Sequence, residues 1–127
     1  MKGYGRLVAV VLIAFLGLFT ASSAHAEKEQ LNAYTIWSER YANAIFSAFT
    51  KDTGIKVNWM RFSSGEVQAR LEAEKNNPQV DVVFGNMAEA FVDGVQKGLF
   101  DPYRPKGAEK IPDAFKDPKG YWTGVAI

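Results

Sequence analysis

Apolar and polar residues follow one another along the chain in short blocks that predict strands and helices in turn. The run 31–35 (LNAYT) predicts a first strand. Between residues 55 and 61 apolar and polar side chains alternate with a period of two, which is typical of a half-buried strand. The almost unbroken apolar run 80–84 (VDVVF) predicts a third strand, of the kind found in the middle of a sheet that is covered on both faces.

Helical spacing fills the intervals between these strands. The first helix is expected to end near Thr50, the second to run from about 64 to 76, and the third to end just before Gly98. Apolar residues at helical spacing are expected to face the core. Helix by helix, they are Tyr41, Ile45, Phe46 and Phe49; Val67 and Leu71; and Ala88, Phe91, Val92 and Val95.

After the third helix the pattern changes. The segment 100–120 contains four prolines and several lysines, which predicts a surface loop with a helical turn around Ala114. The run 121–127 (YWTGVAI) then predicts the start of another strand. The order of strands and helices indicates an α/β fold with a three-layer parallel sheet.

Polar and aromatic side chains follow each predicted strand. In parallel sheets ligands bind outside the carboxyl ends of the strands, and here those ends are 35–38, 62–66 and 84–87. Three loops are therefore expected to meet at one edge and to form a ligand site. Its candidate residues are Trp37, Ser38, Ser63, Ser64, Gly65, Glu66 and Asn86.

Ser63 and Glu66 have the spacing of a capping box, in which each side chain bonds the backbone of the other. Ser64 and Gly65 then lie in the first turn of a helix, where a hydroxyl and free N–H groups can bind an oxyanion. A carboxylate at Glu66 would repel a phosphate unless it is folded away, but it would attract a hard cation. Glu66 is therefore also the candidate metal ligand.

Three other residues each allow two interpretations. Trp37 either stacks on an organic ligand or packs against the first helix. Ser38 is a candidate N-cap of that helix as well as a ligand contact. Asn86 either donates to a ligand oxygen or caps the third helix, and the cap is the favoured interpretation.

Residues 1–26 have the pattern of a cleaved secretory signal peptide. Lys2 and Arg6 precede an uncharged apolar run, and Ala24-His25-Ala26 is a cleavage motif; the alternative is an uncleaved membrane anchor. Without the leader, 13 basic and 14 acidic residues remain, which argues against nucleic acid as the partner. The chain has no cysteine, and its single histidine lies in the leader. Catalytic sites and zinc sites that depend on histidine or cysteine are thereby excluded from the mature part.

Several segments in order along the chain resemble bacterial periplasmic solute-binding proteins of ABC importers. They include TKDTGIKV, RFSSGE, AEKNNPQVDVVFG and GLFDPY. The closest group is the ferric-iron-type family, similar to extracellular solute-binding protein family 1, which also contains binders of phosphate-bearing solutes. The resemblance implies a type II periplasmic-binding-protein fold with two lobes, of which residues 27–127 would form part of the N-terminal lobe.

The resemblance also implies a function. The chain is expected to be a non-enzymatic, monomeric receptor in the periplasm that captures ferric iron and delivers it to an ABC permease of the inner membrane. Fe³⁺ would be the transported ligand, and no cofactor is expected. A phosphate- or phosphonate-bearing organic solute is the alternative ligand. Ferric binders carry a pair of adjacent tyrosines in the second lobe, and no such pair occurs here.

Two other hypotheses remain at this point. The first is a secreted serine hydrolase with Ser63 or Ser64 as the nucleophile, although SSGE lacks the G-x-S-x-G motif. The second is that the chain, which ends on an apolar run without a polar tail, is a truncated product or a partial sequence of a longer protein.

Overall fold

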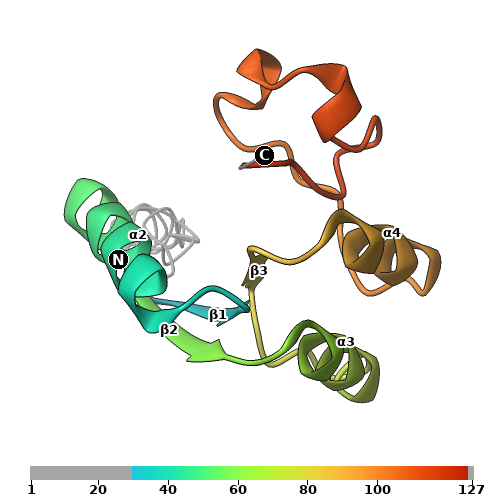
Figure 1. Ribbon diagram of the computed structural model, residues 1–127, viewed down its shortest axis with the longest axis horizontal. Helices are drawn as coiled ribbons and strands as arrows, with labels where there is room; N and C mark the ends of the chain where they lie inside the picture. The colour runs from blue at the N-terminus through green and yellow to red at the C-terminus, as the bar shows by residue number, and fades with distance from the viewer. Residues whose placement is uncertain (1–29, 126–127) are drawn as a thin grey trace, which may run out of the picture.

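The computed structural model describes residues 30–125 of the chain (Figure 1). The strands are β1 (Gln30–Thr35), β2 (Lys56–Arg61) and β3 (Val82–Phe84). The helices are α2 (Glu39–Thr53), α3 (Ser64–Ala73) and α4 (Ala88–Gln96), followed by the 3-10 turns η1 (Ala108–Lys110) and η2 (Asp113–Phe115). The predicted leader, residues 1–26, lies outside this range. Between residues 30 and 125 no helix is long and apolar enough to cross a membrane.

The three strands form one parallel sheet in the order β2-β1-β3. Tyr34 of β1 lies opposite Met60 on one side and Val83 on the other. The predicted alternation of strands and helices and the parallel sheet are thus confirmed.

The predicted place of the third strand was wrong, because β1 and not β3 is central among the described strands. β3 is only three residues long, and Val82 is 40% exposed. An apolar run indicates that a strand is covered, but it does not indicate whether another strand pairs with it on each side.

The core has two parts, one on each face of the sheet. Ala33 points toward α2 and packs with Ala42 and Phe46. The next residue, Tyr34, points the other way and packs with Val67 and Leu71 of α3, as a strand period of two requires. α2 and α3 accordingly lie on opposite sides of the sheet (Figure 1). The predicted inward positions of α3 are confirmed.

The apolar face of α2 differs from the prediction by one position. Tyr41 is 61% exposed, and Ala42 is fully buried in its place. The buried residues of α2 are therefore Ala42 and Phe46, at i and i+4, and Ile45 is partly buried beside them. The prediction placed the large side chain of Tyr41 in the core. The small side chain of Ala42 is buried there instead, because it lets the helix approach β1 closely. The helix also continues beyond Thr50 to Thr53.

The segment after α4 folds on itself. Lys116 is largely buried and donates hydrogen bonds to the carbonyls of Ala108 and Ile111, at 3.2 and 2.7 Å. Its backbone makes an isolated antiparallel bridge with Thr123. The predicted helical turn around Ala114 is confirmed as η2.

The strand predicted at 121–127 is not present over the described residues, where only the bridge at Thr123 forms. The N–H of Gly124 donates back to the carbonyl of Phe115 at 2.7 Å. The apolar run therefore pairs with its own loop instead of joining the sheet. Residues 126 and 127 lie outside the described range.

The shift from Tyr41 to Ala42 can be tested by mutation. Phe46→Ala removes a ring that is 7% exposed and should lower the free energy of unfolding by ~3–5 kcal/mol, because it leaves a cavity. Tyr41→Ala should cost less than about 1 kcal/mol, as surface substitutions usually do. Urea unfolding of both variants checks this, and equal losses would show that Tyr41 is a core residue after all.

Candidate functional site

The three loops at the carboxyl ends of the strands meet, as predicted, at one edge of the sheet. Backbone pairing continues just past the strands: the N–H of Phe62 donates to Thr35 O at 3.0 Å, and the N–H of Ile36 donates to Gly85 O at 3.4 Å. Side chains add to this, since Ser64 Oγ donates to Asn86 Oδ1 at 2.6 Å. The loops after β2 and β3 are thereby joined directly.

Ser63 and Glu66 form the predicted capping box at the start of α3. The N–H and the hydroxyl of Ser63 both donate to Glu66 Oε2 at 2.8 Å, and the N–H of Glu66 donates to Ser63 Oγ at 3.3 Å. These hydrogen bonds hold the pKa of the Glu66 carboxyl below its ordinary value. The carboxylate is thus folded back onto Ser63, although it remains exposed to solvent.

The first turn of α3 and Asn86 leave several N–H donors without a partner. The backbone N–H groups of Ser64 and Gly65 make no hydrogen bond within residues 30–125. Asn86 Oδ1 accepts from both Ser64 Oγ and the N–H of Met87, at 2.6 and 2.9 Å. Its oxygen is therefore occupied, and its Nδ2 group presents only donors. Because Ser64 gives its one hydroxyl proton to Asn86, its oxygen is left as an acceptor.

Asn86 does not cap α4, which was the favoured interpretation. The N-cap residue is Met87, whose side chain makes no capping hydrogen bond. Asn86 lies one position earlier and bonds the N–H of Met87 instead. Ser38 does occupy the N-cap position of α2, but its hydroxyl makes no capping bond and the residue is exposed.

Trp37 is packed against the protein and is half-buried. Its indole meets Phe84 edge-on, with ring centroids 5.3 Å apart, and meets Tyr41 of α2 at 6.3 Å. A Cβ atom at Gly85 would collide with the indole nitrogen. The buried hydroxyl of Thr35 accepts the N–H of Trp37 at 3.2 Å. These contacts favour the packing interpretation, with one part of the ring still accessible.

Arg61 is a charged residue at this edge that the sequence interpretation missed. It is the last residue of β2, and its Nε donates to Trp37 O at 3.1 Å. Its place at the carboxyl end of a strand was the available signal. The guanidinium and the N-terminus of α3 both favour a negative charge nearby. Among residues 30–125, no three His, Cys, Asp or Glu side chains come together as a metal site.

The contact between Trp37 and Gly85 yields a stability prediction. Gly85 has a φ of 70°, so Gly85→Ala combines strain in the left-handed region with a clash against the indole and should cost about 2–4 kcal/mol. Gly65→Ala is the matched control, because nothing lies within 4 Å of its added Cβ atom. That control should be neutral or stabilise by up to about 1 kcal/mol. Thermal unfolding measures both, and a harmless Gly85→Ala would contradict the packing of Trp37.

The capping box predicts a dependence on acid pH. Since Ser63 lowers the pKa of Glu66 from 4.5, the ionised carboxylate stabilises the folded state above pH 4.5, and this contribution is lost as the pH falls through the lowered pKa. The stability gap between wild type and Glu66→Gln in urea should therefore shrink as the pH falls below 4.5. A constant gap for Glu66→Gln would rule out the bond to Ser63.

Comparison with known proteins agrees with this geometry. The family model of the bacterial extracellular solute-binding proteins matches residues 44–127. A probable ABC transporter periplasmic-binding protein of Sinorhizobium fredii is 39% identical over 70 residues, which is 55% of this chain and 20% of the relative. The chain spans about a third of the length of other curated relatives that it matches.

Two solved structures are similar at the level of the fold and the sequence. The ferric binding protein from Campylobacter jejuni superposes with a TM-score of 0.69 at 27% identity, covering 75% of this chain and 30% of that one. The periplasmic binding protein AfuA from Actinobacillus pleuropneumoniae, with fructose 6-phosphate bound, gives a TM-score of 0.67 at 31% identity, covering 72% and 30%. The names of these proteins describe binding and not catalysis, which removes the serine hydrolase hypothesis. The chain belongs to the bacterial extracellular solute-binding protein family.

Proposed function

We propose that this chain supplies part of the N-terminal lobe of a periplasmic receptor that captures a small solute through a phosphate or phosphonate group. The observation that carries this proposal is the set of N–H donors at the edge of the sheet. Ser64 N, Gly65 N and Asn86 Nδ2 have no partner among the described residues, while Ser64 and Asn86 are held together at 2.6 Å. An oxyanion can accept from all three donors at once.

The charges near these donors support an anion. The N-terminus of α3 carries the positive end of the helix dipole, and Arg61 lies at the end of the neighbouring strand. Glu66 would oppose an anion if its carboxylate faced outward. The Glu66 carboxylate accepts hydrogen bonds from Ser63 instead. Because the pKa of Glu66 is lowered, this carboxylate is ionised at neutral pH.

Ferric iron, the ligand expected from the sequence, is the second candidate. Two observations favour it: Glu66 Oε1 makes no hydrogen bond within the described residues, and the Campylobacter jejuni neighbour is a ferric binding protein. A hard cation needs several further oxygen ligands, and no group of three His, Cys, Asp or Glu side chains among residues 30–125 offers them. An anion accompanying the ion would use the same three donors.

The remaining parts of the proposal concern the whole protein. A cleaved leader at 1–26 would export the chain to the periplasm, where a monomer would deliver its solute to an ABC permease of the inner membrane. The Sinorhizobium relative, which is named as an ABC transporter periplasmic-binding protein, supports this role. This chain spans about a third of the length of its relatives. A second lobe, formed by the remaining length, would close over the ligand as in other hinged binding proteins.

The Asn86→Asp variant distinguishes a phosphate- or phosphonate-bearing solute from ferric iron as the ligand. The new carboxylate can still accept from Ser64 and Met87, so the loop should keep its structure, but it replaces the donor Nδ2 group with a negative oxygen. In calorimetric titration of the full-length protein, affinity for fructose 6-phosphate and 2-aminoethylphosphonate should fall by at least about tenfold, because like charges then meet. Binding of Fe³⁺ should stay the same or tighten.

Asn77→Asp is the matched control, because Asn77 lies in the exposed loop after α3 and its side chain makes no hydrogen bond to any residue between 30 and 125. It should leave all affinities unchanged. The proposal is wrong if the wild type binds no phosphate- or phosphonate-bearing solute while Fe³⁺ produces a visible absorption band that survives competition by phosphate.

A further inference from the structure

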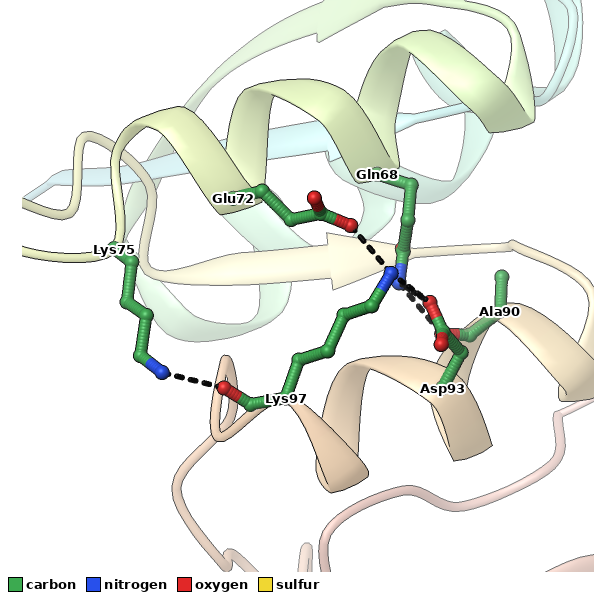
Figure 2. Close-up of polar contacts among 6 residues, drawn as sticks. All are labelled: Gln68, Glu72, Lys75, Ala90, Asp93 and Lys97. Carbon is green, nitrogen blue, oxygen red and sulfur yellow. Dashed lines mark hydrogen bonds and ion pairs between the residues drawn. The ribbon is translucent and has the colours of Figure 1, made fainter.

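α3 and α4 are joined by a row of polar contacts that starts at the candidate site. We call this row the α3–α4 polar interface; Figure 2 shows all of it except its first contact, Ser64–Asn86. Gln68 Nε2 donates to Ala90 O at 3.2 Å and to Asp93 Oδ2 at 3.0 Å. Further along, its members are the ion pair of Lys97 with Glu72 at 2.6 Å and the hydrogen bond from Lys75 Nζ to Lys97 O at 2.6 Å. On the α4 side, Lys97 also pairs with Asp93 at 2.7 Å.

Three of these contacts keep a constant offset along the sequence, while Gln68–Asp93 and Glu72–Lys97 are separated by 25 residues. Ser64–Asn86, Gln68–Ala90 and Lys75–Lys97 are each separated by 22 residues. Two helices that follow parallel strands run in the same direction, and a constant offset means that they advance in register. Gln68 lies one helical turn, about 5.4 Å along the axis, below Ser64. Of the polar contacts between the two helices, those of Gln68 are therefore the nearest to the hydrogen bond between Ser64 and Asn86.

Apolar packing between the two helices themselves is slight. The core cluster on this face contains Val67 and Leu71 of α3 but no side chain of α4 among the described residues. The one buried residue of α4 is Gly94, which lies against the ring of Phe100. Phe100 also packs against the cluster of Tyr34, Val67 and Leu71, so it is an indirect apolar link between the helices. The direct contacts between the helices are mainly polar, and they contribute to the separation of the two helix N-termini.

Gln68 is the most constrained member of the interface. Both partners of its Nε2 group are acceptors, so the amide cannot be turned around. Its Oε1 atom is buried and has no hydrogen-bond partner among the described residues. A buried acceptor without a hydrogen bond costs free energy. Since Gln68 Oε1 is left in this state, the two hydrogen bonds of Nε2 determine where the side chain lies.

We infer that Gln68 is a positioning residue, which sets the distance between the first turn of α3 and the Asn86 amide without touching the ligand. The inference rests on the proposed function only for the nature of the ligand, because the geometry that it describes exists without one. A longer distance would separate Ser64 N and Gly65 N from Asn86 Nδ2. One oxyanion could then no longer accept from all of them.

Two glutamine-to-alanine variants of the full-length protein test the inference. Gln68→Ala should shift the heteronuclear NMR signals of the Ser64 and Gly65 amides and of the Asn86 side-chain amide in the absence of ligand. It should also weaken binding of inorganic phosphate and of fructose 6-phosphate by about tenfold, the equivalent of losing one hydrogen bond between the site and the anion. Gln96→Ala is the control, because Gln96 is exposed at the end of α4 and belongs to no contact of the interface. It should change neither readout.

A rescue experiment covers the possibility that Gln68→Ala only loosens the fold. Gln68→Glu places a second carboxylate against Asp93 and should weaken phosphate binding further. When Asp93→Asn is added, the new amide at position 93 can donate to the new carboxylate at position 68, which is the reverse of the wild-type hydrogen bond. Affinity and the Asn86 signal should then return toward the wild-type values, although the bond to Ala90 O stays lost.

The outcomes separate this inference from the proposed ligand. Unchanged NMR signals in Gln68→Ala overturn the inference, and so does unchanged phosphate affinity in a protein that binds phosphate. If the wild type binds neither phosphate probe but Gln68→Ala still moves the Asn86 signal, the proposed ligand class is wrong and the positioning role is supported.

Discussion

The parallel pairing of β1 with a strand on each side is the constraint on which the candidate site depends. Because both pairs are parallel, the three strands end at the same edge. Hydrogen bonds from Phe62 and Ile36 extend the pairing by one residue into the loops, so that each loop starts from a defined position. The first turn of α3 and Asn86 meet there although 22 residues separate them.

The direction of one carboxylate then determines the charge of that edge. Glu66 could face outward, where it would repel anions, but its Oε2 atom accepts two hydrogen bonds from Ser63, which stabilise the first turn of α3. In the function that we propose, the same capping arrangement leaves the free N–H groups of Ser64 and Gly65 to an anionic ligand. The capping interpretation and the binding interpretation of this turn do not compete, since Glu66 serves the first while Ser64 and Gly65 are left for the second.

Residues whose role depends on near neighbours were predicted well. The alternation at 55–61, the inward positions Val67 and Leu71, and the capping box each involve residues within a few positions of one another. Other predictions failed where the partner was distant, and the cap of α4 by Asn86 failed locally, because Met87 is the N-cap residue. Tyr41 is exposed because Ala42 fits closer to β1, and the run at 121–125 pairs with its own loop at Lys116 instead of with the sheet.

The candidate site divides in the same way. Local pattern was sufficient for the parallel sheet, for the edge where its loops meet, and for Ser63 as the cap of α3, because backbone hydrogen bonding and side-chain periodicity act over short distances along the chain. Folding was needed to bring Asn86 to Ser64, Trp37 onto Gly85, and Gln68 between Ala90 and Asp93. Those contacts depend on the register of the strands and the spacing of the helices, which are set by packing on both faces of the sheet and leave no periodic signal in the sequence.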